Sequence, residues 1–196
     1  SFLLLNSSSS LNLENMQTLI DKASDLDLPL LRDSGQLVSE AISFTKSGEV
    51  VILDPNALTL LYRGIVGERA SAVIAEQLAG EVLQTMITSL DGCDLRYLAR
   101  EKHLNEVPDY GTEIAPIVAE QCAECHREGG IGPFAMDSHL MLQGWAPMIK
   151  EVLLTKRMPP MQVDPDIGHF TNARYVSDAE LQKLVHWIDS GAPRGT

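Results

Sequence analysis

The sequence contains only three cysteines among its 196 residues, and none of them lies in the first 90 positions. A structural zinc site needs about four Cys or His ligands, usually in paired clusters. This chain has a single C-x-x-C pair, Cys122 and Cys125. The scarcity of cysteine therefore argues against a zinc module and against thiol chemistry in the first half. It also leaves Cys93 without an intrachain partner, so we expect a buried or semi-buried thiol there, with a mixed disulfide to another chain as the alternative.

Basic residues are scarce as well, because 15 Lys and Arg stand against 27 Asp and Glu, for a formal net charge of −12. Such a surface disfavours nucleic acid as a partner. It favours a partner protein with a basic docking patch. No apolar run reaches the ~18–20 residues of a membrane span. The chain begins at Ser1 with no visible signal peptide, which indicates a processed or truncated chain.

The run Cys122-Ala123-Glu124-Cys125-His126 has the pattern C-x-x-C-H, which is typical of covalent haem attachment. Each sulfur can add to one haem vinyl group as a thioether, and the histidine can bind the iron. Positions i, i+3 and i+4 share one helix face, so a helical segment would turn all three side chains to one porphyrin. A thioredoxin-type dithiol normally follows a strand, whereas the preceding apolar residues here recur at helical spacing.

The first half alternates short apolar runs with helical patterns. Strands are expected at residues 2–5, 28–31, 50–53 and 58–62, and helices at residues 11–23, 35–41 and 71–90. The turn signal Asp54-Pro55-Asn56 joins two of these strands by a short connection, which predicts an antiparallel hairpin. The order of elements predicts an α/β sandwich with a mixed sheet.

A polar stretch that ends in turn-forming residues separates the two halves. We interpret residues 99–108 as a linker between a domain at 1–98 and a second domain at 109–196. The last helix of the second domain is well marked, because Ser177 and Glu180 form an S-x-x-E capping box and Gly191 stops the helix. The sequence thus predicts a two-domain α+β chain.

Three segments of the first domain, residues 28–33, 48–54 and 61–64, resemble the later part of a thioredoxin-like fold of the redoxin and peroxiredoxin type. In that family a redox cysteine opens the first long helix, and a cis-proline usually precedes the hairpin strand. Residues 1–90 contain no cysteine, and Gly48 or its neighbours stand in the place of the proline. The resemblance therefore implies an incomplete, redox-inactive thioredoxin-like domain.

The second domain resembles an all-α class I cytochrome c domain with a single haem, as in secreted bacterial redoxin–cytochrome c fusion proteins. The likeness rests on residues 122–126, 129–134, 157–160 and 184–193. It implies one covalent haem c held by Cys122 and Cys125, with His126 as an axial ligand of the iron. It also implies that the carbonyl of Pro133 accepts a hydrogen bond from His126. Trp187 is then the aromatic residue that packs where the last helix crosses the haem-bearing helix.

Met158 is the expected second axial ligand. Its thioether is a soft donor that raises the reduction potential when it lies opposite histidine, and Pro159 and Pro160 stiffen its loop. Met161 and His169 remain alternative ligands. Four other candidates are not expected to bind iron: Met141 and Met148 as packing residues, and His103 and His139 in polar segments. His186 is expected to be a surface or packing residue.

These features predict an electron carrier of the bacterial periplasm or cell exterior, because covalent haem attachment takes place outside the cytoplasm. Ligation by histidine and methionine leaves no open position on the iron. The alternative is a haem enzyme, or a gas- or peroxide-reactive protein, with an open sixth position, although the sequence has no obvious distal acid–base pair. A third hypothesis is a subunit of a larger redox complex.

Overall fold

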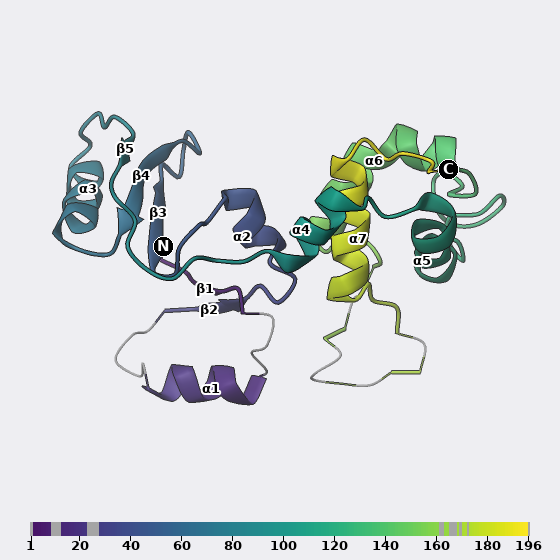
Figure 1. Cartoon of the computed structure of the whole chain (residues 1–196), viewed down its shortest axis with the longest axis horizontal. Coiled ribbons are helices and arrows are strands. Elements are labelled where there is room, and N and C mark those ends of the chain that lie inside the picture. Colours follow the sequence, from purple (N-terminus) through teal and green to yellow (C-terminus); the bar gives the residue numbers. More distant parts are fainter. Residues whose placement is uncertain are drawn as a thin grey trace. The chain divides into compact units, whose positions relative to one another are not determined.

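The computed structural model describes residues 2–8, 13–22, 28–160, 163–164, 168, 170–171 and 173–195. Within these residues the chain forms seven α-helices, one π-helical turn and two small sheets, so the predicted α+β class is confirmed (Figure 1). The chain divides into two compact units, Ser39–Arg96 and the combination of Ser1–Val38 with Tyr97–Thr196. This division differs from the predicted domains at 1–98 and 109–196. None of the described helices is long and apolar enough to cross a membrane.

The smaller unit is built on a three-stranded sheet of order β3-β4-β5, formed by β3 (Glu49–Leu53), β4 (Leu60–Ile65) and β5 (Met86–Ile87). The first two strands are antiparallel, which confirms the predicted hairpin, and the last two are parallel. The single mixed sheet predicted for the first half is wrong, because the strands at Leu4–Asn6 and Leu30–Arg32 form a sheet of their own. Helix α3 (Glu68–Leu78) packs on the sheet (Figure 1). Its Ala70 and Val73 are buried with Leu61 and Tyr62 of β4.

The predicted helix at residues 71–90 is wrong in its second half. Helix α3 ends at Leu78, and Gly80 adopts a φ of 78° two residues later. Glycine takes this left-handed conformation at little cost, which is why it commonly follows a helix end. The chain then turns back and forms β5 beside β4.

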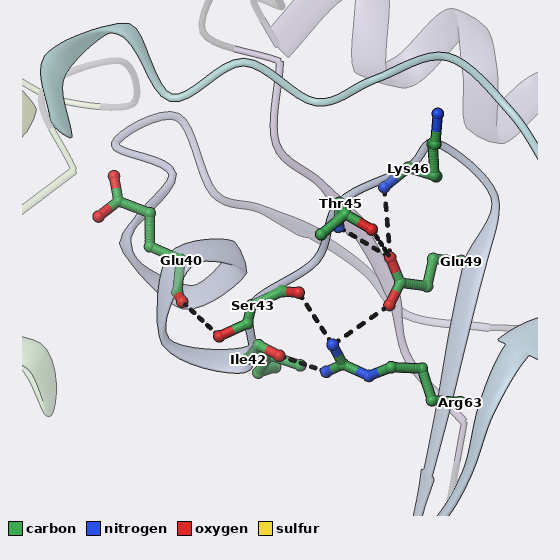
Figure 2. Close-up of polar contacts among 7 residues, drawn as sticks. All are labelled: Glu40, Ile42, Ser43, Thr45, Lys46, Glu49 and Arg63. Carbon is green, nitrogen blue, oxygen red and sulfur yellow. Dashed lines mark hydrogen bonds and ion pairs between the residues drawn. The ribbon is translucent and has the colours of Figure 1, made fainter. Parts of the chain in front are cut away.

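An ion pair holds the turn after helix α2 (Leu37–Ile42) against the hairpin (Figure 2). Arg63 of β4 donates to the carbonyls of Ile42 and Ser43, where α2 ends. Glu49 of β3, whose side chain is 0% exposed, lies 3.5 Å from the same guanidinium and accepts the backbone N–H of Thr45 at 2.8 Å. Arginine at a helix C-terminus stabilises the last carbonyls. Arg63 and Glu49 therefore hold the segment between α2 and β3 against the hairpin.

Cys93 is exposed, and the expectation of a buried or semi-buried thiol is wrong. The residue lies in a turn whose backbone, not its side chain, is held in place. Its carbonyl accepts the N–H of Ser47 at 2.8 Å, and its own N–H donates to the hydroxyl of Ser47 at 3.1 Å. The sulfur is therefore left facing solvent.

In the larger unit, β1 (Leu4–Asn6) and β2 (Leu30–Arg32) form a parallel two-stranded sheet with α1 (Leu13–Lys22) between them in the sequence. The three elements match the predicted strand–helix–strand order. The ends of the predicted helix, residues 11, 12 and 23, lie outside the described residues. The same unit contains α4 (Leu98–Asn105), the π-helical turn η1 (Tyr110–Ile114), α5 (Ala115–Gln121), α6 (His139–Leu154) and α7 (Asp178–Asp189).

Helix α7 contacts α4, α6 and η1, and α4, α6 and α7 lie together in Figure 1. The predicted capping box is confirmed: Ser177 and Glu180 each bond the other's backbone N–H at the start of α7. The core is shared by η1, α5, α6 and α7. Its buried members on these elements are Ile114, Ile117, Val118, Leu142, Ala146, Ile149, Leu153, Leu181, Leu184, Val185 and Trp187.

A pair of buried histidines joins α4 to α7. The stretch predicted as a linker contains α4, whose His103 is only 6% exposed. The two Nδ1 atoms of His103 and His186 lie 2.7 Å apart, so one ring donates a hydrogen bond to the other. Burial, His186 and Lys102 lower the pKa of His103, Glu113 raises it, and Lys183 lowers it further. His186 is thus a buried packing residue.

We predict that the larger unit loses stability in mild acid. The folded state binds a proton at His103 more weakly than the unfolded chain does, so the free energy of unfolding decreases as the pH falls below the ordinary value of 6.5. One proton gives a slope of at most about 1.4 kcal/mol per pH unit. Urea unfolding between pH 7.5 and 5, followed by tryptophan fluorescence, measures this slope, since both tryptophans lie in this unit.

The matched variant is His103→Gln, whose amide can still bond His186 but does not titrate. It should flatten the pH dependence of the free energy of unfolding. Equal slopes for the two proteins would refute the role of this pair.

Candidate functional site

The C-x-x-C-H motif forms one tight turn directly after α5. The helix ends at Gln121, one residue before Cys122, so the motif is not inside a regular helix as predicted. The N–H of Cys122 still donates to Val118 at 2.9 Å, and the N–H of His126 donates to the carbonyl of Cys122 at 2.9 Å. The last bond is an i to i−4 bond of helical type. The two cysteines and the histidine therefore lie within a single turn of helical type.

His126 is buried, with 9% of its surface exposed, and its ring is held by one hydrogen bond. Nδ1 lies 3.0 Å from the carbonyl oxygen of Phe134. A carbonyl can only accept, so Nδ1 carries the proton and donates. In the neutral ring Nε2 then has a lone pair that can bind a metal.

The prediction that Pro133 supplies this carbonyl is wrong by one residue. Pro133 is exposed, and the carbonyl that reaches His126 belongs to Phe134. The loop is tied to the motif on both sides of this point, by Gly132 N–H to Cys125 O at 2.8 Å and by Met136 N–H to His126 O at 2.8 Å. These two bonds set which carbonyl turns inward.

Two glycines allow the loop to lie this close to the motif. A Cβ added to Gly132 would lie 2.7 Å from Nδ1 of His126 and 2.9 Å from the carbonyl oxygen of Cys125. A Cβ on Gly130 would lie 2.4 Å from that same oxygen. Both distances are shorter than van der Waals contact, so any larger residue would push the loop away from the histidine.

Cys122 and Cys125 are free thiols of intermediate exposure. Burial raises the pKa of Cys122 to about 11, with further contributions from Cys125 and Glu180. Reactive redox cysteines have a lowered pKa, because the thiolate is the nucleophile. Cys122 thus has the wrong electrostatics for the attacking thiol of thiol–disulfide exchange. Among the described residues, no group of three or more His, Cys, Asp or Glu side chains could hold a metal ion.

Helix α6 presents a second apolar stripe besides the one it buries in the core. Met141, Trp145, Met148 and Val152 recur at i, i+4, i+7 and i+11 on one face and are half-buried or exposed. Trp145 stacks on Phe134 with ring centroids 4.8 Å apart and an interplanar angle of 16°. Phe134 in turn packs against the ring of His126 at 5.1 Å. Near its start the stripe is therefore joined to the histidine, through Trp145 and Phe134.

The other end of this stripe is joined to Met158. The carbonyl of Val152 accepts the N–H groups of Arg157 at 2.9 Å and of Met158 at 3.2 Å. The methionine side chain is 38% exposed. The predicted alternative ligands Met161 and His169 lie outside the described residues. Thus the stripe on α6 connects the segments that carry His126 and Met158, two residues that the sequence predicts as partners.

Arg174 ties the segment before α7 to the motif. It donates to the carbonyl of Glu120 at 2.6 Å and pairs with the carboxylate of Glu124. A cavity of about 630 Å³ lies between these segments, and polar side chains form most of its walls. They include Glu120, Gln121, Glu124, Thr171, Arg174, Tyr175 and Glu180.

The remaining predicted residues lie in the core of the same unit. Trp187 is 1% exposed and lies where α7 meets η1, with its ring 6.1 Å from that of Tyr110 and its Nε1–H donating to Pro193 O at 2.8 Å. His139 bonds the carbonyl of Ala192 at 2.8 Å through Nε2. Sequence reasoning missed the contribution of Phe134 and Trp145, although the helical spacing of Trp145 with Met141 could have revealed the stripe.

No protein-family model, curated protein or solved structure matches this chain. The function must therefore be argued from the site and not from likeness to a relative. The site comprises two neighbouring thiols, an imidazole whose Nδ1 is bonded to the carbonyl of Phe134, and an apolar helix face joined to it through Phe134.

We predict that Gly132→Ala breaks the contact between the loop and His126. The new methyl group would overlap the imidazole, so the ring or the loop must shift and the bond to Phe134 is lost. Losing that bond at a buried ring should lower the free energy of unfolding by about 1–3 kcal/mol. Urea titration measures the change.

The control is Gly144→Ala on α6, where the added Cβ meets nothing within 4 Å. Alanine is the better helix former, so this variant should be more stable by about 0.5–1 kcal/mol. If both variants were stabilised, the proposed close approach of the loop would be wrong.

Proposed function

We propose that this chain is an electron-transfer protein that carries one covalently attached c-type haem. Cys122 and Cys125 would hold the haem as thioethers, and His126 and Met158 would be the axial ligands of its iron. The observation that carries the proposal is the hydrogen bond from Nδ1 of His126 to the carbonyl of Phe134. Histidine ligands in metal sites almost always donate their other N–H in this way, which fixes the ring and increases its basicity.

The donor set fits a haem better than it fits a bare metal ion or a dithiol. Both cysteines are unpaired thiols and lie in the same turn as the histidine. Zinc would need about two further protein ligands, and exchange chemistry would need an acidic thiol, whereas the pKa of Cys122 is raised. A thiol that is used once to form a thioether needs no lasting reactivity.

The stripe on α6 supports a flat apolar ligand bounded by His126 and Met158. From Trp145 to Val152 the helix rises by roughly 10 Å, and the face between them consists of apolar and aromatic side chains. Such a face is costly to leave in water, and a porphyrin plane would cover it. The backbone N–H of Met158 donates to the carbonyl of Val152, the last residue of the stripe.

Electron transfer is favoured over catalysis at this site. When bound, the haem supplies a one-electron change between ferric and ferrous iron. Binding of the iron by both His126 and Met158 would leave it no open position for a substrate. The side chains of the stripe, Met141, Trp145 and Met148, offer no general acid or base that would serve peroxide chemistry.

The proposal also covers the folds of the two halves, the compartment and the redox partner. We assign residues 109–196 to a class I cytochrome c fold and the first half to a redox-inactive, thioredoxin-like domain, supported by the β1-α1-β2 unit and the β3-β4 hairpin with α3. Covalent attachment implies the bacterial periplasm or exterior. The net charge of −12 favours a redox partner with a basic patch, either free or within a larger complex.

The first test is covalent attachment. The full chain, co-expressed with a haem-attachment system, should have the mass of the polypeptide plus one haem and keep its colour after denaturation. Cys122→Ser and Cys125→Ser together should give a protein from which denaturant removes all haem. Cys93→Ser is the matched control and should keep the full haem content, because Cys93 lies in the other unit. A colourless wild-type protein, which would carry no haem, would refute the proposal.

The second test concerns the axial methionine. Met158→Leu should abolish the methionine-to-iron charge-transfer band of the ferric protein and lower its reduction potential, because the thioether favours ferrous iron. It should also allow the reduced protein to bind carbon monoxide. Met86→Leu, in the smaller unit, should leave the spectrum unchanged.

If Met161→Leu or His169→Ala lost the band while Met158→Leu kept it, the second axial ligand would be Met161 or His169 and not Met158. Rapid carbon monoxide binding by the wild-type protein would favour the alternative of an open-site haem enzyme or gas-reactive protein.

A further inference from the structure

Three aromatic rings from three segments lie in contact at the proposed ligand, with His126 and Phe134 tilted by 57° and Phe134 and Trp145 stacked. His126 ends the motif, Phe134 lies in the loop that follows, and Trp145 lies on α6. The centroid of Phe134 is 5.1 Å from that of His126 and 4.8 Å from that of Trp145. The contact with Trp145 is nearly parallel, at 16°. Phe134 is therefore held between the histidine and the tryptophan.

Phe134 contacts the histidine twice, once through its ring and once through its backbone. Its carbonyl is the acceptor for Nδ1 of His126. The backbone bonds on either side, at Gly132 and Met136, turn this carbonyl inward, and the contacts of the Phe134 ring hold it there. Because the ring and the carbonyl belong to the same residue, contacts that fix the ring of Phe134 also restrict its carbonyl.

Trp145 is poorly explained as a core residue. The buried side of α6 consists of Leu142, Ala146, Ile149 and Leu153. Trp145 lies outside that set and is 41% exposed. A large aromatic side chain left this exposed contributes little to the core, and its ring contact within the chain is the stack on Phe134.

We propose that Trp145 is a positioning residue for His126: its indole clamps Phe134 so that the carbonyl of Phe134 keeps its hydrogen bond to Nδ1 of the histidine. This inference rests on the proposed role of His126 as an iron ligand. A partner of this kind orients the imidazole and makes it a stronger donor to the metal. Trp145 acts through Phe134.

The test compares Trp145→Ala, Trp145→Phe and Leu140→Ala in the full haem-bearing chain. Leu140 is on the same helix, 77% exposed and outside the stripe, so it controls for truncation of an exposed apolar side chain. The readout is the rate at which the Nδ1 proton of His126 exchanges with water, followed by NMR in the reduced protein. The reduction potential and the circular dichroism of each variant are measured alongside.

We expect the Nδ1 proton of Trp145→Ala to exchange roughly fivefold faster, the ratio that corresponds to losing one aromatic stacking contact. Its reduction potential should shift upward, because a weaker Nδ1 bond makes the imidazole a poorer donor to ferric iron. Trp145→Phe should restore most of both values, since phenylalanine can still stack. Leu140→Ala should match the wild type in both.

A haem-bearing Trp145→Ala protein with wild-type exchange would overturn the inference and leave the haem assignment intact. A shift in potential without a change in exchange would also overturn it, since it would mean that the indole acts on the porphyrin and not on the histidine. A wild-type chain that carries no haem would refute the proposed function, and the inference with it.

Discussion

The hydrogen bond between Nδ1 of His126 and the carbonyl of Phe134 determines the form of the site. It decides which nitrogen of the ring is protonated, and so which one can bind a metal. It also requires the loop after the motif to fold back on the turn that carries the cysteines. Gly130 and Gly132 make that approach sterically possible, and the bond from Met136 to the carbonyl of His126 closes the loop.

Helix α7 provides the base on which these parts are arranged. Its buried residues pack against η1 on one side, through Trp187 and Tyr110, and against the buried stripe of α6. Each large apolar side chain buried there contributes about 1.5–3 kcal/mol relative to exposure. Because α5 continues directly from η1, the same core fixes where the motif begins. The second stripe of α6 flanks this buried face, and the proposed haem would cover it.

Local patterns in the sequence predicted the elements whose ends are set by nearby residues. The capping box of Ser177 and Glu180 and the hairpin turn at Asp54 needed no tertiary information. The end of α3 could have been predicted from Gly80, but its apolar spacing continues past the glycine. Contacts between distant residues could not be predicted: His103 and His186 are 83 positions apart, and neither residue type implies the other. The inward carbonyl at Phe134 depends on backbone turns that its neighbour Pro133 does not reveal.

The outward-facing sulfur of Cys93 has a practical consequence. In the proposed haem-bearing protein, Cys122 and Cys125 would be thioethers, and the exposed Cys93 would be the single remaining sulfhydryl of the sequence. A maleimide spin label would therefore react at one position in the smaller unit without any substitution in the protein. Together with ferric iron it would give two paramagnetic centres, whose dipolar coupling reports the separation of the two units in solution.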